Sequence, residues 1–267
     1  MGAPKRGFLT LTRLGFAARG ILYLLVAWLA LRLGRAEDAG QALAYLASGR
    51  GRFLLAAMAA GFLAYGLWRL ADAAFDLERR GDDAKALGVR AVAAGSGLIH
   101  LGLAFAAAKL AFGYGHGGGG TSRKAEAASG IALHLPGGDL LLYAGAAALL
   151  AAGIAQFVKA ARRKFLDHLR PDARRRWWIA AAGCAGYAAR GAVFATAAWL
   201  LLHAARDRNP GEAGALGDAL EAMPRAAEMA VAGGLAFFGA FCLIEAWYRI
   251  LPEPRMPEKL KRKLPGR

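Results

Sequence analysis

The chain has 267 residues, of which 57% are apolar, and its mean hydropathy is +0.32 although its formal net charge is +16. These values exclude an ordinary soluble globular domain. A chain that is both so apolar and so highly charged requires a lipid environment for its apolar segments. The pI near 10.5 does not indicate nucleic-acid binding, since the basic residues are not gathered on a soluble module.

Six apolar segments are each long enough to cross a bilayer, which takes roughly 20 residues of α-helix. In chain order they are residues 9–33, 53–75, 87–112, 140–161, 177–203 and 226–250. The polar remainder is too short and too dispersed for a soluble domain. We therefore predict an all-α polytopic integral membrane protein with one membrane domain over residues 1–267. The first apolar run is longer than the core of a signal peptide, so we expect the chain to retain it.

The first span recurs later in the chain. Residues 14–33 read LGFAARGILYLLVAWLALRL, residues 185–204 read AGYAARGAVFATAAWLLLHA, and a weaker copy lies at residues 91–110. Such repetition is typical of a chain built from copies of one structural unit. We predict three parallel two-helix repeats, each starting and ending on the same side of the membrane, and a pseudo-threefold bundle of their six spans. The three predicted repeats cover about residues 7–80, 85–165 and 174–251.

A short amphipathic helix is predicted between the two spans of each repeat. Apolar residues there follow the i, i+3, i+4, i+7 spacing of one helical face, and glycine or proline ends each stretch. The three stretches are residues 39–46, 128–135 and 216–223. Their apolar faces are small, so we expect packing against the spans to hold these helices at the outer membrane surface.

Lysine and arginine alternate between the loops. They are concentrated before the first span, between the second and third, between the fourth and fifth, and after the sixth. Because an excess of basic residues marks the cytoplasmic side, we predict that both termini are cytoplasmic and that residues 252–267 form a basic cytoplasmic tail. The cytoplasmic clusters, such as Arg174 to Arg176, are expected to meet anionic headgroups, so membrane lipids are expected partners.

Ionisable side chains inside a span are costly and indicate a functional site with a partner to be identified. On the first spans, one repeat position holds Arg19, Ser96 and Arg190, and the position one turn further outward holds Tyr23 and His100. We therefore take these five residues as candidate ligand-binding residues, together with Arg69, Gln156 and Glu245 of the second spans.

The second spans contribute a further polar layer at the same predicted depth. Aligning Gly66 with Gly153 and Cys242 places three polar residues at one position: Arg69, Gln156 and Glu245. Two interpretations stay open. In the structural one, Glu245 pairs with one arginine, while the other arginines bond backbone carbonyls or reach headgroups. In the functional one, Arg19 and Arg190 hold an anion and Glu245 acts as counter-ion or gate.

The sequence offers no catalytic constellation. No acid pair and no nucleophile–histidine–acid spacing lies within the spans. The two cysteines, Cys184 and Cys242, fall inside predicted spans without metal-ligand spacing. We therefore expect a non-enzyme without metal, cofactor or nucleic-acid partner. The glycine-rich residues 113–122 lack the residue order of a phosphate-binding loop and are expected to form a linker.

The motifs GFAARGILYLLVAWLAL, QALAYL and GFLAYGLWRLADA carry a family resemblance. They resemble a family of bacterial inner-membrane proteins known as domain of unknown function 1206, with three two-span units and the pattern G-x-x-A-R-G-x-x-Y. The first copy matches fully, at Gly15, Ala18, Arg19, Gly20 and Tyr23. The third copy matches at Gly186, Ala189, Arg190 and Gly191, with Phe194 in place of the tyrosine. The resemblance implies a bacterial inner-membrane location and no particular activity.

Two functional hypotheses follow from these observations. The first is a small-solute carrier or channel-like protein, in which Arg19 and Arg190 favour a small anion. The three two-span units are similar in layout to the mitochondrial carriers, which is an analogy of fold only. The alternative is a non-catalytic membrane scaffold, partner subunit or lipid-binding envelope protein, in which the arginines are paired to protein groups or lipid phosphates.

Overall fold

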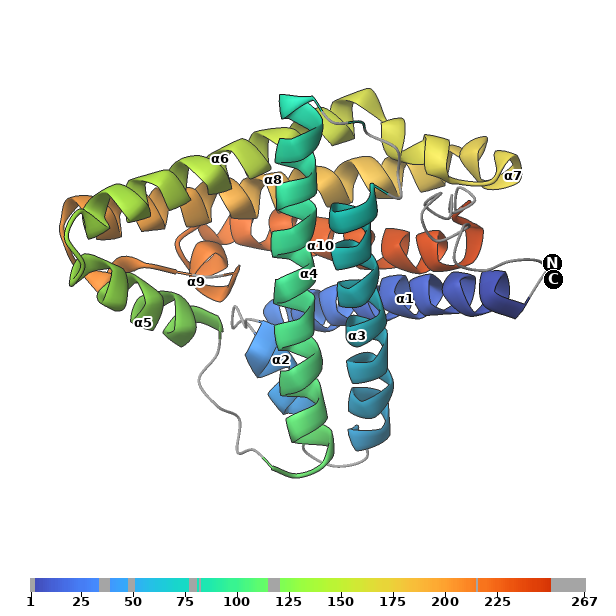
Figure 1. The fold of residues 1–267 in the computed structure, drawn as a ribbon, viewed down its shortest axis with the longest axis horizontal. Helices are drawn as coiled ribbons and strands as arrows, with labels where there is room; N and C mark the ends of the chain where they lie inside the picture. The colour runs from blue at the N-terminus through green and yellow to red at the C-terminus, as the bar shows by residue number, and fades with distance from the viewer. Residues whose placement is uncertain are drawn as a thin grey trace, which may run out of the picture.

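The computed structural model describes residues 3–33, 39–47, 51–76, 81, 83–114, 121–214 and 216–250. Within these ranges the chain is helical and has no β-strand, only an isolated antiparallel bridge between Leu169 and Arg249 (Figure 1). The six long helices are α1 (Ala3–Leu33), α3 (Arg52–Phe75), α4 (Ala84–Ala111), α6 (Gly138–Arg162), α8 (Trp177–Arg206) and α10 (Arg225–Tyr248).

All six long helices have the length and hydropathy of a membrane span, which confirms the predicted polytopic all-α fold. A short helix lies between the two spans of each repeat, as predicted. These helices are α2 (Ala39–Ala47), α5 (Thr121–Leu133) and α9 (Leu216–Glu221). The remaining elements are the 3₁₀ turns η1 (Lys164–His168) and η2 (Pro210–Glu212) and the four-residue helix α7 (Pro171–Arg174).

Two of the short helices are held by apolar side chains that pack against the spans. Ala42 and Leu43 of α2 are fully buried in a cluster with side chains of α1, α3 and α4. Ala219 and Leu220 of α9 are fully buried in a second cluster with side chains of α8 and α10. Helices this short are marginal alone, so this packing is what stabilises them.

Hydrogen bonds near the ends of the spans join neighbouring repeats. Each bond joins the first turns of one repeat's first span to the last turns of another repeat's second span. The bonds run from Arg13 Nη2 to Trp247 O (3.5 Å), from Arg90 Nε to Ala73 O (2.7 Å) and from Cys184 Sγ to Ala160 O (3.2 Å). The start of each first span therefore lies beside the end of a second span from another repeat.

Long helices of different repeats meet through pairs of glycines. In each of three contacts, a Cβ built on the second-span glycine would crowd the carbonyl oxygen of the first-span glycine. The contacts are Gly66–Gly97 (3.0 Å) between α3 and α4, Gly153–Gly191 (3.1 Å) between α6 and α8, and Gly239–Gly20 (2.8 Å) between α10 and α1. The same joint therefore connects repeat one to two, two to three and three back to one, and small residues permit the close approach.

In repeats one and three the two spans of the repeat also pack against each other. An aromatic residue of the second span packs against a glycine of the first, and an alanine of the first packs against a glycine of the second. In repeat one these pairs are Tyr65–Gly15 and Ala18–Gly61, and in repeat three they are Phe238–Gly186 and Ala189–Gly234. The repeated sequence thus builds the same contact twice.

The middle repeat lacks this contact. Val92 stands at the position of Gly15, and Ala152 stands at that of Tyr65, so the glycine and the aromatic partner are both missing. Val92 is 66% exposed, and a Cβ built on Gly95 meets nothing within 4 Å. As a result α4 and α6 each pack extensively against just one other long helix. The six spans form an open row in the order α4, α3, α1, α10, α8, α6, and the predicted pseudo-threefold bundle does not close.

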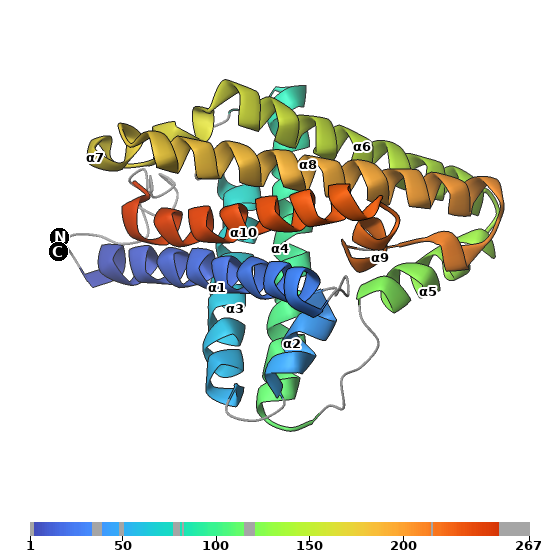
Figure 2. The same cartoon turned by 180° about the vertical axis from the view of Figure 1, so that it is seen from behind.

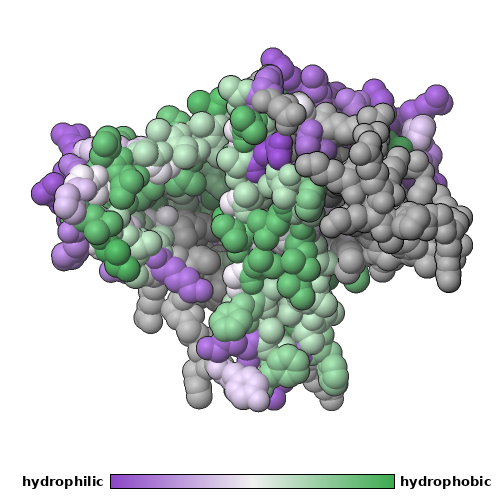
Figure 3. Space-filling view, viewed as in Figure 1, coloured by the Kyte–Doolittle hydropathy of each residue, from purple (hydrophilic) through white to green (hydrophobic). Residues whose placement is uncertain are grey.

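The open row is visible in the overall shape. Figures 1 and 2 show α1, α10, α8 and α6 running side by side, whereas α3 and α4 cross their direction. Figure 3 shows an apolar surface over the exposed side of α4, where Leu98, Ile99 and Phe105 are each more than 60% exposed. Such an apolar outer surface suits a helix that faces lipid.

Candidate anion-binding site

The glycine joints correct the predicted alignment of the second spans. Gly66, Gly153 and Gly239 occupy the same place in the three joints, so Cys242 is not the equivalent of Gly66. The residues three positions further on are Arg69, Gln156 and Cys242. Glu245 instead shares its position with Asp72 and Lys159. The prediction that placed Glu245 with Arg69 and Gln156 is wrong. It aligned Cys242 with Gly66 by sequence likeness, whereas the close contact between helices requires a glycine at that position.

The structure brings Arg19 and Arg190 together around two shared aromatic rings. The guanidinium carbon of Arg19 lies 4.9 Å from the ring centre of Phe238 and 5.8 Å from that of Tyr23. The corresponding distances for Arg190 are 4.7 Å and 5.6 Å. The rings attract the cations through their faces, and the planar guanidinium keeps its N–H groups at its edge. Arg19, Arg190 and Tyr23, three of the predicted residues, therefore lie in one cluster.

Arg19 has one further polar partner, because its Nη1 donates a hydrogen bond to Tyr65 Oη (3.1 Å). The Nε of Arg19 is buried and has no hydrogen-bond partner in the described ranges. Neither Arg19 nor Arg190 forms an ion pair with a carboxylate of the described residues. A buried N–H without an acceptor is costly, so the cluster has donor capacity that an anion would satisfy.

Two buried carboxylates of the second spans are held by other arginines. Glu245 accepts a hydrogen bond from Arg249 Nη1 (2.6 Å), and Asp72 pairs with Arg69 Nη1 (3.6 Å). Glu245 is therefore not the counter-ion of the arginine pair in this structure. The charge of that pair is balanced only by aromatic faces and by a phenol oxygen among the described residues.

The other predicted residues lie at the edge of the cluster or apart from it. The ring of His100 lies 4.5 Å from that of Tyr65, and its Nδ1 donates to the backbone carbonyl of Ser96 (2.7 Å). His100 thus reaches Arg19 through Tyr65, and Ser96 contributes a carbonyl to His100. Gln156 is buried on α6, and its Oε1 has no hydrogen-bond partner in the described chain.

Sequence reasoning missed four residues that shape the site, namely Tyr65, Phe238, Asp72 and Arg249. The signal for Phe238 was present, because placing Gly239 opposite Gly66 also places Phe238 opposite Tyr65. Asp72 follows Arg69 by three residues, so the two share a face of α3. Arg249 lies just past the last turn of α10, and the sequence pattern alone groups it with the basic tail.

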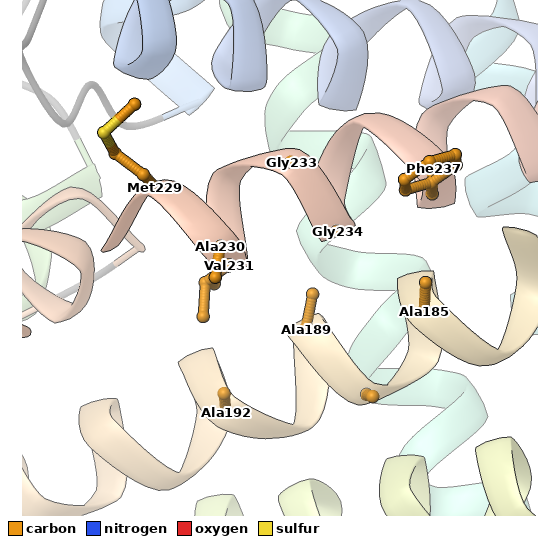
Figure 4. Close-up of a pocket in the computed structure, with 10 residues that line it drawn as sticks. Ala185, Ala189, Ala192, Met229, Ala230, Val231, Gly233, Gly234 and Phe237 are labelled. Atoms are coloured by element: carbon orange, nitrogen blue, oxygen red, sulfur yellow. The ribbon is translucent and has the colours of Figure 1, made fainter. Parts of the chain in front are cut away.

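A shallow apolar groove of about 420 Å³ lies between α8 and α10 (Figure 4). Alanines such as Ala189 and Ala192 line it from α8, and Gly233 lines it from α10. Met229 and Phe237 lie at its two ends in Figure 4. Every residue that lines the groove is apolar or glycine, so the groove suits a hydrocarbon chain and not an anion.

Comparison with known proteins gives one match. Residues 14–76, 91–163 and 185–249 match the family described as Domain of Unknown Function (DUF1206). Each matched segment ends ten residues after one of the joint glycines Gly66, Gly153 and Gly239, in the register that the structure gives. No curated protein and no solved structure matches the chain. Because the three segments cover most of its length, the chain belongs to the DUF1206 family.

Proposed function

We propose that this membrane protein is a small-solute carrier or channel-like protein that takes a small anion at Arg19 and Arg190. The observation that carries the proposal is the pairing of these two arginines around Phe238 without a carboxylate partner in the described ranges. An anion at their N–H edges would supply the acceptor that Arg19 Nε lacks, through charge-assisted hydrogen bonds. Arg19 and Arg190 are cations inside two spans and have no carboxylate partner in the described ranges. They also favour the binding of an anion, because charge interactions are strong at low dielectric.

The test is thermal unfolding of the purified protein in detergent with nitrate, phosphate or sulfate at constant ionic strength. An anion that binds only the folded state raises the unfolding midpoint, and at 100 times its Kd it adds about 2.7 kcal/mol to the free energy of unfolding. We expect at least one anion to raise the midpoint of the parent. We expect the rise to disappear in Arg19→Ala and in Arg190→Ala.

The control for this experiment is Arg206→Ala, at the exposed end of α8, which should keep the full response to the anion. Each variant is compared with its own midpoint without anion, so a general loss of stability does not count. An unchanged response in both Arg19→Ala and Arg190→Ala would remove the proposed site. A positive result then justifies measuring anion flux in vesicles.

A second candidate function, a lipid-binding membrane scaffold, is favoured by the groove between α8 and α10. The groove is apolar, lies within two spans and is open at its surface, as a site for an acyl chain requires. Phe238 is also fully buried between the two arginines, which fills the space that a continuous pathway would need. A midpoint that responds to anionic phospholipid but to no small anion would favour this function.

We further propose a bacterial inner-membrane location with both termini cytoplasmic, on the basis of the loop charges. Single cysteines in a variant without Cys184 and Cys242 test the orientation. Tyr114→Cys follows α4 on the predicted outer side, and Tyr114 is 78% exposed. Asp172→Cys lies in α7, in the loop predicted to be cytoplasmic. On intact cells, an impermeant thiol reagent should label Tyr114→Cys and spare Asp172→Cys, and the reverse pattern would invert the topology.

A further inference from the structure

We infer that Glu245, Arg249 and the segment between α6 and α8 form a gate that closes the Arg19–Arg190 site at the end of α10. The inference rests on the proposed function in one respect, namely that the gate admits a small anion. The closed geometry itself rests on contacts among described residues. We call the backbone of residues 168–170 the strap, because it holds the end of α10 in place.

The first step is the position of the Arg249 side chain. Its guanidinium carbon lies 4.8 Å from the ring centre of Phe16 on α1 and 5.8 Å from that of Trp68 on α3. Phe16 also meets Tyr65 edge to face at 5.5 Å, and Tyr65 binds Arg19. Arg249 therefore spans three helices directly beside the arginine cluster. It lies next to that cluster, toward the start of α1.

The second step is the ion pair that fixes Arg249. The Arg249 Nη1–Glu245 Oε1 distance is 2.6 Å, and the two side chains are only 12% and 4% exposed. Removing one partner of such a buried pair leaves the other charge without compensation. An anion that displaced Glu245 from Arg249 would in turn leave the Glu245 carboxylate buried without compensation. The pair is therefore stable when closed.

The third step is the strap. Its backbone forms an antiparallel bridge with Arg249, in which Arg170 N donates to Tyr248 O (3.0 Å) and Ile250 N donates to His168 O (2.8 Å). Leu169 of the strap is buried in a cluster with Phe165, Ile179 and Phe241, which anchors it against α8 and α10. Figure 2 shows the end of α10 beside the start of α1 and the α7 region. The basic segment between α6 and α8 thereby holds the residue that closes the site.

Cys242 provides a reporter for this gate. It is fully buried on α10, one turn from both Phe238 and Glu245, and Cys184 is the only other cysteine. In a Cys184→Ala background, the rate at which an anionic methanethiosulfonate reagent modifies Cys242 measures access to the arginine level. The closed parent should react slowly. Glu245→Gln, which removes one charge that holds Arg249, should raise the rate at least tenfold.

A second variant tests the strap. Ile250→Pro removes the N–H that bonds His168, and the extended conformation of Arg249 (ψ 131°) is compatible with a following proline. We expect it also to raise the modification rate at least tenfold. The matched control is Glu228→Gln, because Glu228 is another buried acid of α10 that pairs with an arginine, Arg225 (2.8 Å), at the opposite end. Its Cys242 rate should stay within twofold of the parent.

The gate is overturned if neither Glu245→Gln nor Ile250→Pro speeds the modification, or if Glu228→Gln speeds it equally. Circular dichroism and a monodisperse elution profile show which variants are folded, and either gate variant alone decides the result if the other does not fold. The reagent reports access without any anion bound. A faster rate together with no anion-dependent midpoint would therefore keep the gate and reject the proposed anion function.

Discussion

Asp72→Asn is expected to lower the free energy of unfolding by about 3–5 kcal/mol, the range for breaking a buried ion pair. The Asp72 carboxylate is fully buried near the end of α3 and lies 3.6 Å from Arg69 Nη1, whose side chain is 16% exposed. Asparagine keeps the shape but removes the charge, so the guanidinium of Arg69 stays buried without its counter-charge. Denaturant unfolding of the purified protein in detergent measures the change.

Asp139→Asn is the matched control for this prediction. Asp139 also lies 3.6 Å from an arginine, Arg208, but the two side chains are 39% and 72% exposed. An exposed pair at the same distance contributes at most about 1 kcal/mol, because water already solvates both charges. Equal losses for the two substitutions would show that burial does not set the cost, and would contradict the structural assignment of Asp72.

Gly239→Leu is expected to lower the free energy of unfolding by about 3 kcal/mol, at the upper end of the usual cost of overpacking. A Cβ on Gly239 would lie 2.8 Å from the carbonyl oxygen of Gly20 and 2.9 Å from the backbone nitrogen of Leu24. Backbone atoms cannot rotate away as side chains do, so α1 and α10 must separate. The midpoint of thermal unfolding in detergent reports the loss.

The same helix supplies a control in Gly233→Leu. A Cβ on Gly233 meets nothing within 4 Å, because this residue faces the open groove between α8 and α10. We expect a change within about 1 kcal/mol in either direction, since the leucine side chain enters free space next to lipid. A loss at Gly233 as large as that at Gly239 would mean that leucine itself, and not the close approach to α1, causes the damage.

The spans and short helices were predictable from sequence because both follow from local patterns. A run of apolar residues long enough to cross a bilayer sets the bounds of α3 and α10, and a short apolar periodicity sets α2 and α9. The equivalence of Arg19 and Arg190 was also predictable, since both lie in the same AARG motif. These features require no knowledge of which helix packs against which.

The order of the helices and the ion pairs were not predictable in the same way. The order in which helices pack depends on complementary surfaces. In repeats one and three, Tyr65 and Phe238 pack on glycines, and only this knowledge shows that Ala152 at the equivalent position removes a helix contact. The partner of Glu245 was missed because Arg249 stands at the very end of the predicted span 226–250, where a basic residue is grouped with the charged tail. An alignment register wrong by three residues then carried Glu245 away from Asp72, its true equivalent.

The open row has a consequence for biosynthesis. Nearly all extensive contacts lie within residues 3–114 or within residues 121–250, and the α1–α10 interface is the one that joins the two sets. The border between them runs through the middle repeat, so the sequence repeats and the packing units do not coincide. Translation proceeds from the N-terminus, so the first span made has to wait for the last before the two sets can join. The close fit of Gly20 against Gly239 therefore cannot form before the last span has been made.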